Sequence, residues 1–62
     1  MKYKELEKAL AKIGCYNTGR VQAGHPLWFS PKTGNTFQLS HHGKEEVATG
    51  TLKKIKRMAG LE

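Results

Sequence analysis

Two segments of the chain repeat apolar residues with the period of an amphipathic helix. The apolar stripes are Leu6, Ala9, Leu10 and Ile13 within residues 2–13, and Leu52, Ile55, Met58 and Ala59 near the other end. Recurrence at every third or fourth position places each set on one face of a helix. Gly14 and Gly60 follow the stripes, and glycine commonly ends a helix. We therefore expect a helix at each end of the chain, the second capped by Thr49 or Thr51.

The middle of the chain has no helical period, and its first part is typical of two β-strands. Tyr16, Thr18 and Val21 are strand-forming residues, and Gly19 interrupts them in a way that indicates a bulge. A tight reversal follows, and residues 26–30 are then apolar and aromatic. We therefore expect two strands joined by a short turn.

A third strand is expected over residues 36–40. The preceding residues 31–35 favour a turn, because a proline presets one backbone angle and a glycine supplies a positive φ. Phe37 and Leu39 alternate with polar residues, so these two side chains are expected to face a core. The polar stretch 41–47 is expected to be a loop before the last helix.

The order of these elements predicts a single α+β domain over residues 1–62 with an αβββα arrangement. The strands are joined by short turns, so the three-stranded sheet should be antiparallel. Each helix has one apolar face, so both helices should cover the same face of the sheet and leave the other face open to solvent. A chain of 62 residues provides for one small core and no second domain.

The charge of the chain narrows the kinds of partner that it can bind. Eleven lysine and arginine residues face five acidic residues, and the formal net charge is +6. So dense a positive charge favours a polyanion or an acidic protein as partner. Cys15 is the only cysteine, which excludes a disulfide within the chain and favours a reducing cytoplasm. We expect no signal peptide and no membrane span, because no suitable apolar segment exists.

Several kinds of chemistry are excluded by residues that are absent or badly spaced. The chain has no Asp, and its Glu residues lie in polar stretches, so a catalytic pair of carboxylates is not indicated. No serine has the sequence context of a hydrolytic triad. His25, His41, His42 and Cys15 could ligate zinc on paper, but the short spacings of zinc ligands are absent and adjacent histidines point apart in extended chain. We therefore expect no metal and no cofactor.

His25 is the residue best suited to chemistry. It follows the small residues Ala23 and Gly24, which let another backbone approach closely, and it leads into the aromatic second strand. Imidazole exchanges protons near neutral pH, and RNA carries its own nucleophile in the 2′-hydroxyl group. A histidine base could therefore cleave RNA without a metal if lysine or arginine neutralised the phosphate. The alternative, from the residues alone, is that His25 simply ends a turn.

Other candidate residues have a structural explanation beside the functional one. Trp28 and Tyr16 could stack on nucleic-acid bases, but core packing is favoured because a small domain needs its large apolar groups. Cys15 is expected to be a small buried residue and not a nucleophile. One side of the last helix is basic and could follow phosphates or simply be solvated, and it consists of Lys53, Lys54, Lys56 and Arg57.

Short motifs along nearly the whole chain have an order and spacing found in one known family. They are the first amphipathic helix ending at Gly14, Arg20, Gly24-His25 with Trp28, Pro31, Ser40-His41-His42-Gly43-Lys44, Gly50-Thr51-Leu52 with Ile55, and Ala59-Gly60-Leu61. Each motif is short, and their order carries the comparison. Through them the chain resembles the HicA-type toxins, the small mRNA interferases of bacterial HicA–HicB toxin–antitoxin modules.

The resemblance has implications for fold, activity and partners. It implies a fold like the double-stranded-RNA-binding domain and a catalytic histidine early in the second strand, a role that carries over to His25. The family commonly has Gly-Ser-His at this point, where this chain has Ala23-Gly24-His25. Family members cleave mRNA and block translation, and a HicB antitoxin silences them. RNA and a HicB-type antitoxin that covers the histidine and the basic surface are therefore the partners that the resemblance implies.

Phosphate contacts are expected from Arg20, Lys32 and Lys44, on the basis of their charge and of their expected position beside the open face of the sheet. Two other functions stay open beside that of a ribonuclease toxin. A non-catalytic RNA-binding module of the same fold would use the same basic residues and would not need the imidazole. A degenerate toxin would bind its antitoxin and no longer cut RNA.

Overall fold

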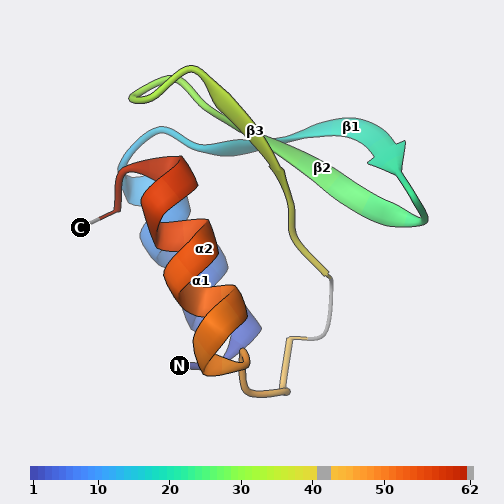
Figure 1. The fold of residues 1–62 in the computed structure, drawn as a ribbon, viewed down its shortest axis with the longest axis vertical. Coiled ribbons are helices and arrows are strands. Elements are labelled where there is room, and N and C mark those ends of the chain that lie inside the picture. Colours follow the sequence, from blue (N-terminus) through green and yellow to red (C-terminus); the bar gives the residue numbers. More distant parts are fainter. Residues whose placement is uncertain (41–42, 62) are drawn as a thin grey trace.

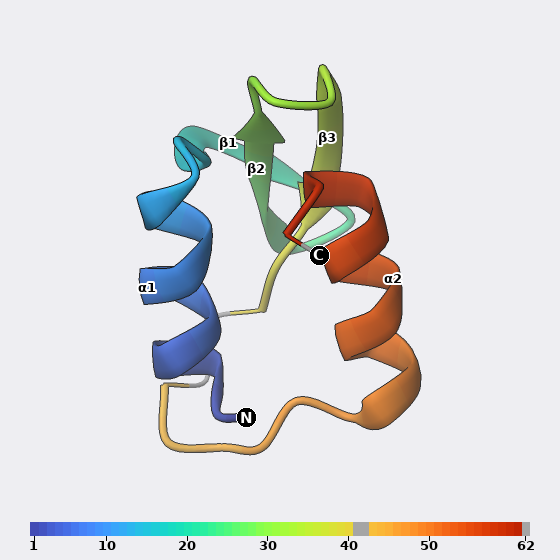
Figure 2. The same ribbon diagram turned by 90° about the vertical axis from the view of Figure 1, so that its left-hand side faces the viewer.

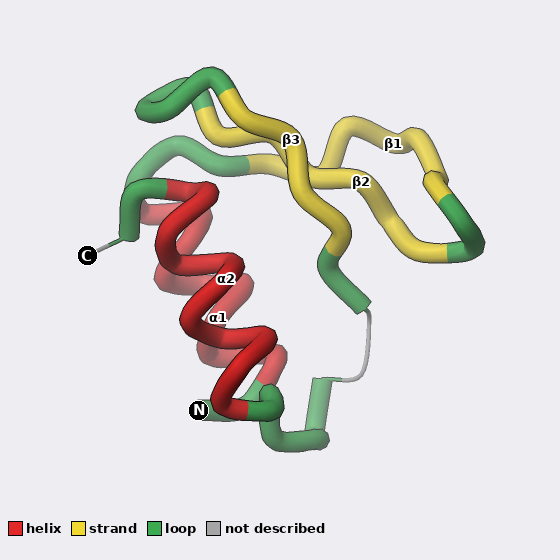
Figure 3. Tube along the Cα trace, in the orientation of Figure 1, coloured by secondary structure: helices red, strands yellow, loops and turns green. Residues whose placement is uncertain are grey.

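The computed structural model describes residues 1–40 and 43–61, and its elements follow the order expected from the sequence (Figure 1). The elements are helix α1 (Tyr3–Lys12), strands β1 (Tyr16–Gln22), β2 (His25–Ser30) and β3 (Asn35–Gln38), and helix α2 (Thr49–Ala59). The strands form one antiparallel sheet in the order β1-β2-β3, with β2 in the centre (Figure 3). The predicted αβββα arrangement is confirmed.

Both helices lie on one face of the sheet and run in the same direction (Figure 2). Leu6 and Leu10 of α1 and Ile55 and Ala59 of α2 are buried, which confirms the two apolar stripes. They join one core with the buried residues Cys15, Trp28, Phe37, Leu39 and Val47. Core packing of Trp28 and of the cysteine is thereby confirmed. Within the described residues, no helix is both long and apolar enough to cross a bilayer.

The C-terminal end of α2 is attached to the sheet by side-chain hydrogen bonds. The hydroxyl group of Ser30, which is fully buried, donates to the carbonyl oxygen of Ala59 at 2.7 Å. The Thr33 hydroxyl and the Asn35 amide both donate to the carbonyl oxygen of Met58, at 2.5 and 3.1 Å. The last carbonyl groups of a helix have no partner within it. The turn between β2 and β3 therefore supplies the partners that the end of α2 lacks.

The N-terminal end of α2 differs from the expectation. Ala48 is the N-cap residue and forms no side-chain cap hydrogen bond, so the predicted cap by Thr49 or Thr51 is wrong. The preceding Val47 is buried, and its N–H group donates to the carbonyl oxygen of Met1 at 2.9 Å. This tertiary contact fixes where the chain turns into the helix, and both threonines consequently fall inside the first turn.

The loop over residues 43–47 packs against the N-terminus of α1. The N–H groups of Tyr3 and Lys4 donate to carbonyl oxygens of this loop at 3.0 and 3.2 Å. These bonds satisfy donors that have no partner inside the helix. The ammonium group of Met1 lies 2.9 Å from the Glu46 carboxylate, and this hydrogen bond and charge lower the pKa of Glu46.

A bulge in β1 changes its register against β2, as the glycine in this segment predicts. Asn17 lies opposite Trp28, and Val21 lies opposite Pro26. Between these two pairs β1 advances by four residues and β2 by two. Gly19 has a φ of 80°, a left-handed conformation that glycine adopts without steric cost. The bulge therefore decides which face each later side chain of β1 occupies.

Tyr16 does not lie in the core, so its expected position is wrong. Its partner across the sheet is Phe29, which follows Trp28 on β2. Neighbouring residues of a strand point to opposite faces, and Trp28 points into the core. Tyr16 and Phe29 therefore point to the face of the sheet away from the helices, here called the open face, and Tyr16 is 53% exposed.

Strand β3 ends at Gln38, two residues before the end of the predicted segment 36–40. The next residue still pairs with β2, because the N–H group of Leu39 donates to the carbonyl oxygen of Pro26 at 3.0 Å. Leu39 and Phe37 are both buried, which confirms the predicted alternation along this segment. The chain therefore leaves β3 in extended form and brings its next residue beside the beginning of β2.

Candidate active site

His25 is held at the beginning of β2 by the two-residue turn that joins this strand to β1. The turn residues Ala23 and Gly24 have φ angles of 52° and 80°. Two positive φ angles give the turn a twist that matches a β-hairpin. Alanine rarely adopts this conformation, so the hairpin holds the backbone before His25 under strain. Gln22 pairs with His25 across the turn, and His25 is exposed.

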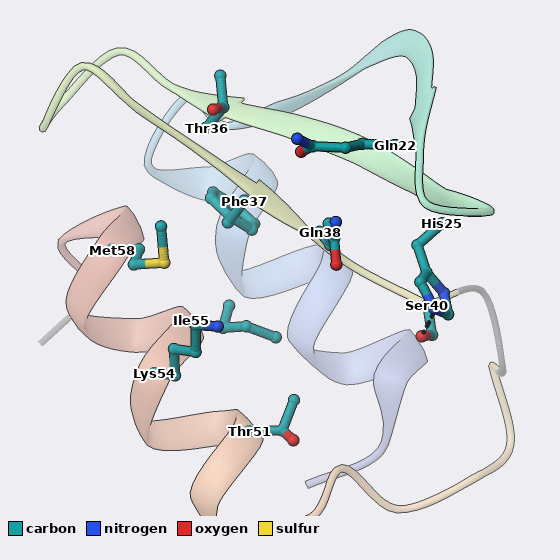
Figure 4. Close-up of a pocket in the computed structure, with 10 residues that line it drawn as sticks. All are labelled: Gln22, His25, Thr36, Phe37, Gln38, Ser40, Thr51, Lys54, Ile55 and Met58. Atoms are coloured by element: carbon teal, nitrogen blue, oxygen red, sulfur yellow. Dashed lines mark hydrogen bonds between the residues drawn. The ribbon is translucent and has the colours of Figure 1, made fainter.

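The hydroxyl group of Ser40 lies 3.3 Å from Nδ1 of His25 (Figure 4). The register between β2 and β3 explains this contact. Ser30 lies opposite Asn35 at the turn. Counting five residues away from this turn reaches His25 on one side and Ser40 on the other, so the register brings these two residues opposite each other. The contact engages Nδ1 whichever atom carries the proton, so Nε2 is the ring nitrogen left for exchanging a proton with a ligand.

His25 and Ser40 lie at one end of a groove of about 390 Å³ that runs along the edge strand β3 beside α2, and Met58 lies at the other end (Figure 4). A volume of this size is typical of small-ligand sites. Apolar and polar side chains both line the groove, and the lining also includes Gln22, Thr36, Phe37, Gln38, Thr51, Lys54 and Ile55. Amides, hydroxyls and an ammonium group therefore lie around the apolar side chains of the groove, and this combination suits a polar ligand.

The three basic residues predicted to contact phosphate lie in different parts of the fold. Arg20 is on β1 and borders a second, shallower hollow on the open face. Lys32 is in the turn after β2, at the opposite end of that strand from His25. Lys44 is in the loop beside the N-terminus of α1. These three residues are not among those that line the groove of His25.

Among the described residues, Lys54 is the lysine or arginine that lines the groove, together with polar residues that include Ser40, Gln22 and Gln38. From the sequence, Lys54 is recognisable only as one residue of the basic side of the last helix, and Ser40, Gln22 and Gln38 have no predicted functional role. A local signal existed for Lys54, because it precedes the core residue Ile55 and borders the apolar stripe. Ser40 could have been found by counting the hairpin register outward from the turn.

Of the four candidate metal ligands, the structure describes His25 and Cys15. His41 and His42 lie outside the described residues. Within residues 1–40 and 43–61, no three His, Cys, Asp or Glu side chains come close enough together to hold a metal ion. Cys15 is a free thiol, and it is buried in the core as expected.

Comparison with known proteins assigns the chain to a family. The family model described as HicA toxin of bacterial toxin-antitoxin matches residues 3–61. Comparisons with curated proteins and with solved structures find no match. The match includes both helices, all three strands, and the turn and groove around His25. The resemblance indicated by the sequence motifs is thus confirmed, and the chain belongs to the HicA toxin family of bacterial toxin–antitoxin systems.

Proposed function

We propose that this toxin is a metal-independent endoribonuclease that cleaves mRNA in the cytoplasm and so blocks translation. The observation that carries the proposal is the exposed imidazole of His25, which lies in a polar groove with its Nδ1 beside the Ser40 hydroxyl. Membership of the HicA toxin family supports the toxic role. Lys54 on the same groove supplies the positive charge that a phosphate requires.

The proposed reaction uses the 2′-hydroxyl group of the RNA as the nucleophile. Nε2 of His25 removes the proton of this hydroxyl, and the resulting oxygen attacks the adjacent phosphorus atom. A bond between O2′ and phosphorus forms, the bond between phosphorus and O5′ breaks, and O5′ takes up a proton from water, while the proton on Nε2 returns to the solvent. The ammonium group of Lys54 stabilises the negative charge that develops on the phosphate oxygens. The products are a 2′,3′-cyclic phosphate and a 5′-hydroxyl end.

We further propose that a HicB-type antitoxin neutralises the toxin by covering this site. The exposure of His25 leaves the imidazole accessible to a protein partner. A net charge of +6 favours a partner with an acidic surface. An antitoxin bound there would exclude RNA from the groove without any change in the fold of the toxin.

A cleavage assay with excess EDTA tests the proposed activity. We expect purified toxin to cut labelled RNA and to leave 2′,3′-cyclic phosphate and 5′-hydroxyl ends. RNA with a single 2′-deoxynucleotide at the cleaved position is the matched control and should stay intact, because it lacks the nucleophile. RNA that is bound but never cut would instead support a non-catalytic RNA-binding module. A chain that binds only antitoxin would be a degenerate toxin, and either result contradicts the proposal.

Replacing Ser40 by alanine is expected to slow cleavage by about 2- to 10-fold, the effect of losing one neutral hydrogen bond in the transition state. The loss should appear in kcat and not in KM, because Ser40 orients the imidazole and does not itself bind RNA in the proposed reaction. Ser40→Thr keeps the hydroxyl group and should restore most of the rate. Equal rates of RNA cleavage for Ser40→Ala and the native chain would show that Ser40 takes no part in the mechanism.

A further inference from the structure

The open face of the sheet carries an aromatic pair at the end of β2 opposite to His25. Tyr16 of β1 lies opposite Phe29 of β2, the ring centroids are 5.7 Å apart, and the ring planes are tilted by 58°. Tyr16 is 53% exposed and Phe29 is half-buried. Both helices lie on the other face of the sheet, so these rings are directed toward solvent (Figure 1).

The bulge in β1 brings a positive charge to the same face. The Thr18 hydroxyl donates to the carbonyl oxygen of Leu27 at 2.8 Å, and the N–H group of Arg20 donates to the Thr18 hydroxyl at 3.2 Å. These bonds fix the backbone of the bulge against β2. Arg20, Thr18, Leu27 and Thr36 then border a hollow of about 230 Å³ together with the two rings. The hollow therefore combines aromatic faces with a guanidinium group.

This hollow adjoins the groove that contains His25. Thr36 borders both of them. His25 and Phe29 are four residues apart on β2, so their positions lie on the same side of this strand. The rise of a strand gives a separation of about 13 Å between these two positions. A flexible polymer that lies along β2 can therefore touch the aromatic pair and the imidazole at the same time.

We propose that the open face is a stacking platform for unpaired bases of single-stranded RNA. The bases stack on Tyr16 and Phe29, Arg20 contacts the backbone, and the chain continues over Thr36 toward His25. Aromatic faces stack on any base, and arginine adds charge and a planar surface. The bases of a duplex are stacked within the helix and are inaccessible to such rings, so the platform selects single strands. The proposal rests on the proposed function for the identity of RNA as the ligand.

RNA binding by a variant that does not cleave RNA tests the platform separately from catalysis. In a His25→Ala background, the affinity for a short labelled single-stranded RNA and for a hairpin duplex of the same composition is measured by fluorescence anisotropy. We expect tighter binding of the single strand, and Tyr16→Leu should raise its Kd by about 5- to 150-fold. Tyr16→Trp should restore binding. Arg20→Ala should instead reduce the salt dependence of the affinity, because one phosphate contact is lost.

Val21→Ala is the matched control variant. Val21 is 68% exposed on the same strand, and it lies opposite Pro26, which places it on the face of the helices. This variant should bind RNA like its parent, and thermal unfolding should show that every variant is folded. Unchanged binding by Tyr16→Leu, or equal affinity for the duplex, would overturn the platform.

The same experiment separates the platform from the other proposals. A Tyr16→Leu variant that binds RNA normally but loses only its affinity for the antitoxin would assign this face to the protein partner and overturn the platform. Native toxin that cuts RNA while Tyr16→Leu binds normally would leave the proposed function intact. Binding that depends on Tyr16, without any cleavage by the native chain, would support the platform and reject the ribonuclease.

Discussion

Replacing His25 by alanine is expected to lower the rate of RNA cleavage by about 10²- to 10⁴-fold, the usual contribution of a general base. The variant should fold normally, because His25 is exposed and forms its side-chain contact with Ser40 at the surface. A surface substitution of this kind changes the free energy of unfolding by about 0.5 kcal/mol or less. Cleavage in EDTA and thermal unfolding, measured on the same preparation, check both halves of this expectation.

His25→Gln distinguishes a proton acceptor from a binding group at this position. A glutamine amide can form hydrogen bonds with RNA, but it does not accept a proton at neutral pH. If His25 is the general base, this variant should be as inactive as His25→Ala. Substantial cleavage by His25→Gln would show that the imidazole only binds RNA. Lys53→Ala, on the exposed side of α2 outside the groove, is a control that should retain activity.

Replacing Ser30 by alanine is expected to destabilise the fold by about 1–3 kcal/mol. The variant removes the 2.7 Å hydrogen bond to Ala59 and leaves a buried helix carbonyl group without its partner. A typical stability of about 0.05–0.15 kcal/mol per residue gives roughly 3–9 kcal/mol for 62 residues, so the loss is a large fraction of the total. Thermal unfolding should show a Tm lower by about 4–8 °C for each kcal/mol lost.

Thr33→Ala is the matched control for this effect, because it removes a hydroxyl group bonded to the same end of α2. Its acceptor, the carbonyl oxygen of Met58, keeps the hydrogen bond from Asn35, and the Thr33 site is exposed to water. We therefore expect this variant to be destabilised by less than about 1 kcal/mol. A Ser30→Ala variant as stable as the native chain, or no more affected than Thr33→Ala, would show that the buried hydrogen bond contributes little.

The elements of this fold could be predicted from sequence because their signals are local. The apolar stripe of α1, the turn at Ala23 and Gly24, and the bulge at Gly19 each depend on residues within a few positions of one another. The prediction of a catalytic role for His25 rests on such a signal together with the resemblance of the whole chain. Local pattern and family motif therefore led to the arrangement of elements and to the residue on which the proposed reaction depends.

The errors and omissions all concern contacts that are distant in the sequence. The position of Tyr16 depends on which residue of β2 lies opposite it, and β1 has no clear alternation of apolar and polar residues from which to read this. The contact of Ser40 with His25 requires the register of β2 against β3. The start of α2 after Ala48 depends on packing of the preceding residue against the other end of the chain.

Helix α2 is restrained at one end much more than at the other. Side chains of β2, of β3 and of the turn between them bond its last carbonyl groups, whereas its N-cap residue forms no side-chain hydrogen bond and its first turn contains Gly50, a weak helix former. Local unfolding begins at helix ends that are weakly held. The first turn of α2 therefore opens more readily than the last. Since α2 lines the groove, we expect this side of the groove to be held more firmly near Met58 than near Thr51.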